Sequence, residues 1–109
     1  MKSRYIVRPK ARRDIDRQAV YLTEQADPKI AYRFLTAVRE TFELLASHPA
    51  IGWPPPAKSK KGDSFRMFSV TGFDKMLVVY RPIEDRVEIL RVLHGAMDID
   101  AVIRNEQIE

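Results

Sequence analysis

Residues 75–94 read KMLVVYRPIEDRVEILRVLH. Two β-prone runs, residues 75–82 and 86–94, are separated here only by Ile83-Glu84-Asp85, which favours a hairpin connection. The centre of the first run, residues 76–80, is nearly continuous apolar sequence, as in a strand covered on both faces, whereas the second run begins with cleaner alternation. The stretch therefore predicts two neighbouring antiparallel strands within a sheet.

The sequence on the N-terminal side extends this sheet. Residues 64–70 form a third β-rich run, separated from the second by Thr71-Gly72-Phe73-Asp74, so the three runs predict an antiparallel meander. At the start of the chain, Tyr5-Ile6-Val7 is a short β-prone run stopped by Pro9. We expect this N-terminal strand to join the sheet edge.

Two amphipathic helices are predicted between these strands. The first carries Ile15, Ala19, Leu22 and Ala26 at steps of four, three and four. Asp27-Pro28 then matches a helix N-cap followed by proline at the first helical position. The second helix, which ends at Ser47-His48-Pro49, presents one apolar stripe: Ala31, Phe34, Leu35, Val38, Phe42 and Leu45.

The near absence of a linker between the helices predicts an antiparallel hairpin that covers one sheet face. The fold class is thus α+β in a single domain spanning residues 1–109, with a short C-terminal helix as an option in residues 98–109. Residues 49–63 hold prolines, glycines and the cluster Lys58, Lys60 and Lys61, which indicates an exposed loop.

Composition limits the chemistry. The chain has no cysteine, no signal-peptide pattern and no apolar run long enough to span a bilayer, so we expect a cytoplasmic protein that does not bind membranes. A net charge of +4 and a pI near 9.6 favour an acidic partner, either nucleic acid or an acidic protein segment. Phosphate-binding loops, nucleophile elbows and zinc-ligand spacings are missing, so no cofactor and no metal is expected.

Four sequence landmarks resemble the ParE/RelE toxin superfamily, especially its ParE branch. They are the opening segment 5–15, the turn His48-Pro49-Ala50-Ile51-Gly52, the pair Phe65-Arg66-Met67-Phe68 with Val78-Val79-Tyr80-Arg81-Pro82, and Val87-Glu88-Ile89-Leu90-Arg91-Val92-Leu93-His94-Gly95-Ala96. One departure is Met97-Asp98, where many relatives have Arg-Asp, so a basic contact is missing there.

The resemblance implies the toxin of a type II toxin–antitoxin module, a class associated with plasmid stabilisation. A ParE-like chain would bind DNA gyrase without catalysis, and a ParD-like antitoxin would wrap it in a hetero-oligomer. Operator DNA would be reached only indirectly, through the antitoxin. The alternatives are a RelE-like endoribonuclease that cuts mRNA on the ribosome and a non-toxic basic binding module.

Candidate residues for binding the antitoxin or the target are basic or aromatic. They are Arg12, Arg13, Arg66, Tyr80, Arg81 and Arg91. Arg66 and Arg81 could equally fix the sheet through charge pairs or carbonyl contacts, or hold an antitoxin carboxylate or RNA phosphate. In the nuclease alternative, Arg66, Arg81 and His94 would form the catalytic set, which needs cations around the phosphate and a proton-transfer group.

Three further residues have a structural and a functional interpretation. His94, before Gly95, is expected to end a strand beside a tight turn rather than act as a base. His48 in the last turn of the second helix suits the negative end of the helix dipole. Trp53 is either a rim aromatic for a partner or a satellite of the core, which burial distinguishes.

Overall fold

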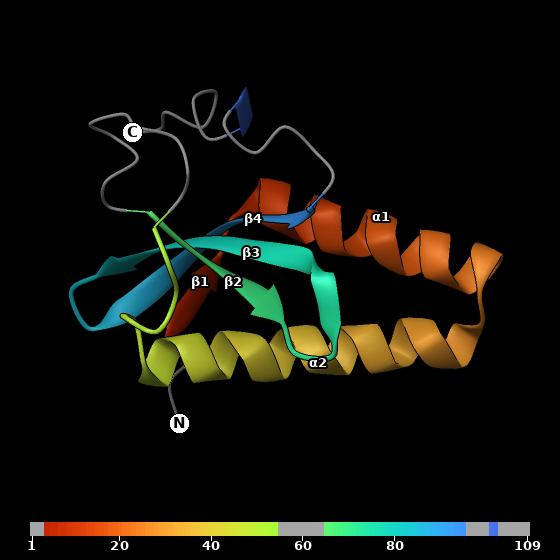
Figure 1. Ribbon diagram of the computed structural model, residues 1–109, viewed down its shortest axis with the longest axis horizontal. Coiled ribbons are helices and arrows are strands. Elements are labelled where there is room, and N and C mark those ends of the chain that lie inside the picture. Colours follow the sequence, from red (N-terminus) through yellow and green to blue (C-terminus); the bar gives the residue numbers. More distant parts are fainter. Residues whose placement is uncertain (1–3, 55–64, 96–100, 103–109) are drawn as a thin grey trace.

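The computed structural model describes residues 4–54, 65–95 and 101–102, which form two long helices and a four-stranded sheet (Figure 1). The elements in chain order are β1 (Tyr5–Val7), α1 (Pro9–Gln25), α2 (Pro28–Ser47), β2 (Arg66–Val70), β3 (Phe73–Ile83) and β4 (Arg86–His94). The predicted α+β class is confirmed.

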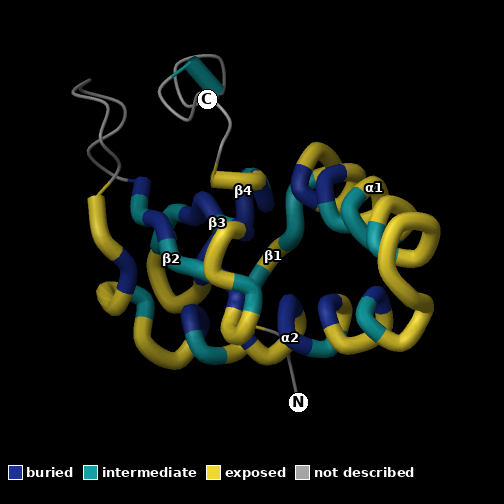
Figure 2. The backbone as a smooth tube through the Cα atoms, turned by 45° about the vertical axis from the view of Figure 1, so that its right-hand side comes forward, coloured by how far each residue is buried: buried dark blue, intermediate teal, exposed yellow. Residues whose placement is uncertain are grey.

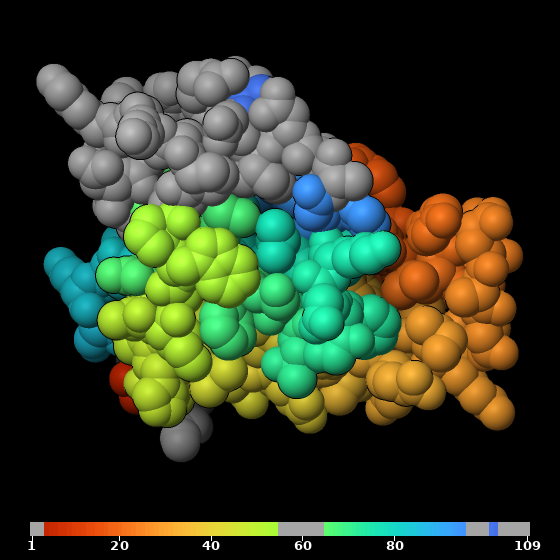
Figure 3. Space-filling view, in the orientation of Figure 1, coloured from red at the N-terminus to blue at the C-terminus, as the bar shows by residue number. Residues whose placement is uncertain are grey.

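Both helices begin at the proline positions that the sequence indicates. Pro9 opens α1, and Asp27 caps α2 with its Oδ1 atom, which accepts a hydrogen bond from the Lys29 backbone N–H at 2.7 Å. Because α2 starts directly after α1, the two helices run antiparallel (Figure 1). Their connected ends form a lobe that extends beyond the strands in the space-filling view (Figure 3).

The strand order in the sheet is β1-β4-β3-β2. The N-terminal strand joins the edge, as expected, and pairs in parallel with β4, whereas β2, β3 and β4 form the antiparallel meander. At the opposite edge, Trp53 exchanges backbone hydrogen bonds of 2.9 and 2.8 Å with Met67 of β2. Trp53 is 43% exposed and its ring lies 6.1 Å from the Phe68 ring, so this residue is partly packed against β2 and partly open to solvent.

The strand connections are tighter than the sequence suggested. The predicted turn 71–74 shortens to Thr71-Gly72, and Ile83 belongs to β3, which leaves Glu84-Asp85 as the second turn. Gly72 adopts a φ of 82°, which glycine accommodates easily. Glu84 adopts a φ of 49°, and a positive φ is uncommon for residues other than glycine. The first predicted separator was too long because Phe73 packs against the core instead of remaining in the turn.

Two separate clusters of buried apolar side chains pack on the sheet. Figure 2 colours the buried residues along the backbone dark blue. On one face, α1 and α2 pack on strand residues that include Val70, Val78, Tyr80 and Ile89. The second face carries a separate cluster against which Val102 packs: Phe65, Met67, Val79, Leu90 and Leu93.

Two predictions about burial need correction. The start of β4 was expected to alternate between buried and exposed residues, but all of residues 87–90 are buried, because apolar clusters pack on both faces of the strand and two arginines cover Glu88. Leu35 was placed in the core stripe of α2, yet it is 39% exposed. Of the predicted C-terminal helix, Ala101 and Val102 are helical, and the other residues of 98–109 lie outside the described residues, as do Lys58, Lys60 and Lys61.

Candidate partner-binding site

Glu88 joins three strands through two arginines. It lies on β4 between β1 and β3, and its side chain is only 12% exposed. Arg8, which follows β1, donates to its Oε2 atom at 2.6 Å, and Arg81 of β3 donates to its Oε1 atom at 2.6 and 3.2 Å. Arg81 also lies 5.8 Å from the centroid of the Phe65 ring.

The electrostatics of this cluster follow from burial and pairing. Burial alone would raise the pKa of Glu88, but the hydrogen bonds and charges of Arg81 and Arg8 outweigh it and lower that pKa below its ordinary value. Glu88 is therefore ionised at neutral pH. The two arginines balance a buried charge, so their donors are directed into the fold.

Arg91 serves a similar purpose at the other end of β4. Val92 lies beyond the three residues of β1, and its N–H points away from β3. In the described part of the chain, no further strand lies beside this N–H. The buried Asp14 carboxylate of α1 accepts this N–H at 2.9 Å and is held by Arg91 through bonds of 2.8 and 3.0 Å. Arg91 thus fixes α1 against the sheet edge.

Tyr80 and Arg66 hold the turn after α2. The Tyr80 hydroxyl donates to the Pro49 carbonyl at 2.8 Å and accepts the Gly52 N–H at 2.9 Å, while Arg66 donates to the Gly52 carbonyl at 2.7 Å. A side chain on Gly52 would place its Cβ only 2.6 Å from the Tyr80 hydroxyl. Burial raises the pKa of Tyr80, partly offset by the Gly52 hydrogen bond and the Arg66 charge, so the hydroxyl stays protonated as a donor.

The structure does not bring the proposed nuclease set together. Arg66 is opposite Tyr80, which belongs to the helix-side core, whereas Arg81 is opposite Glu88 and next to Phe65 of the second cluster. His94 ends β4, six residues beyond Glu88, a separation of roughly 20 Å along a strand. These side chains cannot converge on one phosphate in this arrangement.

A solvent-open groove lies between α1, α2 and β1. Its volume is about 230 Å³, and β1 runs between the two helices (Figure 2). Apolar side chains from all three elements line it: Tyr5, Val7, Ile15, Leu35, Val38 and Phe42. Arg12 from α1 and Arg39 from α2 complete the lining, and both residues are exposed. The groove therefore combines apolar walls with positive charge from both helices.

An exposed stripe on α2 extends the groove toward the hairpin end. Tyr32 is 72% exposed and lies three and seven residues before Leu35 and Arg39, which places the three near one side of the helix. Sequence reasoning missed these residues as site candidates. The sequence did contain one signal, the width of the apolar stripe. Consecutive residues such as Phe34 and Leu35 point about 100° apart on a helix, so a stripe that contains both is wide enough to leave one of them exposed.

The chain matches a known protein family. The model of the ParE toxin of type II toxin–antitoxin systems, parDE, matches residues 5–99. The chain belongs to the ParE toxin family. A solved chain titled as the chromosomal ParDE system from P. aeruginosa has the same fold as this ParE-family chain, with 16% identity and a TM-score of 0.68, covering 84% of this chain and 95% of the other. No curated protein matches the sequence.

Other kinds of site receive no support in the described part of this ParE-family chain. Residues 4–54, 65–95 and 101–102 contain no group of His, Cys, Asp or Glu that could hold a metal ion. No helix among them is long and apolar enough to cross a membrane. Of the candidate binding residues, Arg12 and Arg13 are exposed on α1, whereas Tyr80 is fully buried and has no surface to offer a partner.

Replacing Tyr80 with Phe removes the hydroxyl that satisfies Pro49 and Gly52. We expect Tyr80→Phe to lower the free energy of unfolding by about 2 kcal/mol, because the buried Gly52 N–H and the part-buried Pro49 carbonyl lose their partner. Urea denaturation measures the change. Tyr21→Phe is the matched control, since Tyr21 is 57% exposed, and it should change stability by less than about 0.5 kcal/mol. Equal effects of the two substitutions would contradict the assigned role of Tyr80.

The lowered pKa of Glu88 predicts acid-sensitive stability. A carboxylate with a depressed folded pKa stabilises the protein above its unfolded pKa, near 4.5, and loses this contribution as the pH falls through the folded value. We expect Glu88→Gln to lower the free energy of unfolding at pH 7 by about 1–3 kcal/mol. The difference from the original chain should shrink when unfolding is measured below pH 4.5. If the stability difference between the two chains stayed constant down to pH 2–3, Glu88 would not stabilise the fold as an ionised carboxylate.

Proposed function

We propose that this chain inhibits growth by binding DNA gyrase and that a ParD-like antitoxin neutralises it by occupying the α1–α2 groove. The family match over residues 5–99 supports the toxin role, and the fold shared with a chain of a ParDE system supports an antitoxin partner. The observation that carries the binding mode is the groove itself, with its apolar walls and two arginines. A gyrase inhibitor would act in the cytoplasm.

The chemistry of the groove defines the segment that fits it. Exposed apolar surface at Leu35 and Tyr32 favours an amphipathic helix that lays its apolar face between α1 and α2. Arg12 and Arg39 stand on opposite helices, so a bound helix with carboxylates on both flanks would pair with each. Arg13, exposed beside Arg12, adds to the positive field that attracts such a segment.

The arrangement of the sheet arginines favours a non-catalytic inhibitor over a nuclease. Arg81 and Arg91 are bound to Glu88 and Asp14, and Arg66 is bound to the Gly52 carbonyl. Catalysis of RNA cleavage requires cations and a proton-transfer group around one phosphate. Recruiting Arg81 would remove one of the two arginines that bind the buried Glu88 carboxylate, and recruiting Arg91 would take the arginine away from buried Asp14; breaking a buried ion pair costs several kcal/mol.

The groove is tested by placing a charge in its apolar wall. We expect Leu35→Asp to weaken binding of the purified chain to a ParD-like antitoxin by about 100-fold, because a carboxylate would be buried against the apolar face of the bound helix. Isothermal titration calorimetry measures the affinity. Val20→Asp is the control, since Val20 is 56% exposed on α1 and does not line the groove. Unchanged affinity for Leu35→Asp would exclude the groove as the antitoxin site.

The target is tested by induced expression without antitoxin and by two assays of the purified chain. We expect inhibition of gyrase supercoiling while mRNA stays intact in the presence of ribosomes. Cleaved mRNA with normal supercoiling would establish the RelE-like alternative. A chain that causes no growth defect and affects neither assay would instead be a non-toxic binding module.

A further inference from the structure

A second depression lies across β1 from the groove. Its volume is about 490 Å³, and we call it the β1 pocket after the strand it shares with the groove. The lining residues are Ile6, Ile83, Glu84, Asp85 and Arg86. Tyr5 and Val7 line the groove, whereas Ile6 lies between them in the strand and so points to the opposite face of the sheet.

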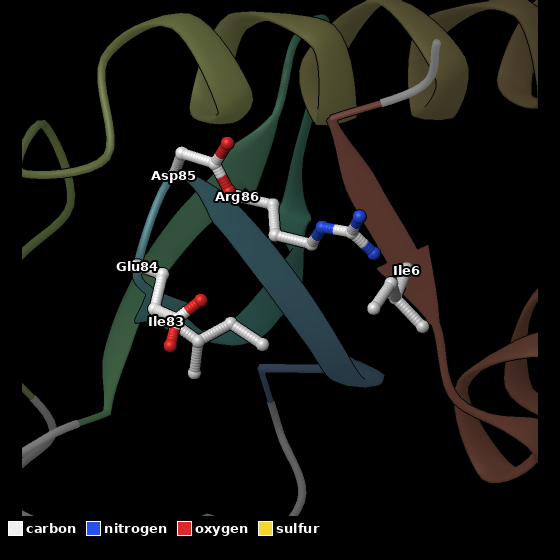
Figure 4. Close-up of a pocket in the computed structure, with 5 residues that line it drawn as sticks. All are labelled: Ile6, Ile83, Glu84, Asp85 and Arg86. Atoms are coloured by element: carbon white, nitrogen blue, oxygen red, sulfur yellow. The ribbon is translucent and has the colours of Figure 1, made fainter.

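The charged groups of the β1 pocket differ from those of the neighbouring cluster. Glu88 is held by two arginines, but within the described residues no hydrogen bond or ion pair engages the side chains of Glu84, Asp85 or Arg86. Figure 4 shows the Arg86 side chain pointing toward Ile6, while the Glu84 carboxylate lies beside Ile83 on the other side of the pocket. The Glu84 carboxylate and the Arg86 guanidinium therefore lie at separate points of the pocket, one beside Ile83 and the other toward Ile6.

Glu84 has a backbone conformation that is unfavourable for its residue type. Its φ of 49° lies in the left-handed region, where glycine or asparagine would be accommodated more easily. The conformation holds the carboxylate on the pocket side of the β3–β4 turn (Figure 4). Glu84 and Asp85 are exposed carboxylates at one turn, so both are available to a cationic side chain of a partner.

We propose that the β1 pocket receives a lysine or arginine side chain from an extended segment of the antitoxin, next to the part that fills the groove. This inference rests on the proposed function, because it extends the same partner from one side of β1 to the other. β1 is an edge strand, so a polypeptide can pass around it. Crossing about 10 Å of sheet takes roughly three or four extended residues.

Each lining group has a role in this arrangement. The aliphatic stem of the inserted side chain packs on Ile6 and Ile83, and its cationic end binds Glu84 and Asp85. Arg86 is directed toward β1, where the crossing segment would pass, and donates to its carbonyl or carboxylate oxygens. The partner is thus expected to be acidic where it lies over the groove and to present a basic residue at the β1 pocket.

Neutralising the two carboxylates tests the proposal with little change in shape. We expect the double variant Glu84→Gln/Asp85→Asn to weaken binding of the full chain to the ParD-like antitoxin by about tenfold at low salt. The loss should shrink as salt is raised, because exposed charge pairs are screened. Asp74→Asn, which removes an exposed carboxylate elsewhere on β3, should leave the affinity unchanged.

Comparison with the groove variant separates this inference from the proposed function. If Leu35→Asp abolishes binding and the double variant binds as the original chain does, the β1 pocket is not a contact and the groove assignment stands. If neither variant weakens binding, both assignments fail. A double-mutant cycle then identifies the inserted residue: replacing one antitoxin lysine or arginine with glutamine should weaken binding to the original chain but not to the double variant.

Discussion

The ion-pair cluster around Glu88 determines how the rest of the surface can be used. A buried carboxylate on a central strand must be paired, and the chain pairs it with Arg8 beyond one neighbouring strand and Arg81 on the other. These contacts tie β1, β4 and β3 together and direct two arginines into the fold. Asp14 binds Arg91 in the same way near the other end of β4. The positive charge that remains accessible around the groove comes from the helices.

The short edge strand β1 takes part in several features of the surface. Its three residues cover only part of β4, so Asp14 must satisfy the Val92 N–H beyond the strand. On the helix side of this edge strand, apolar side chains of β1, α1 and α2 meet solvent in the groove. On its other face, Ile6 contributes to the β1 pocket. One small edge strand therefore separates two surfaces that a single wrapped partner could contact.

Local sequence signals predicted the elements but not the side-chain partners. Asp27-Pro28 and the alternation of apolar residues specify where helices and strands begin, because these effects act within a few residues. Arg66, Arg81 and Arg91 bind partners that are 14, 7 and 77 residues away. Local sequence patterns therefore do not indicate which groups these arginines bind. Leu35 was misassigned because a residue at the margin of an apolar stripe is buried or exposed according to which element packs beside it.

Methyl NMR spectroscopy of the chain with and without a ParD-like antitoxin tests the central claim most directly. If the partner occupies the helix groove, the methyl signals of Ile15 and Leu35, which line it, will shift strongly on binding. Signals of Leu90 and Leu93, which belong to the second cluster on the opposite sheet face, will change little. Strong shifts at Leu90 and Leu93 with unchanged signals at Ile15 and Leu35 would show that the partner binds the sheet and not the helices.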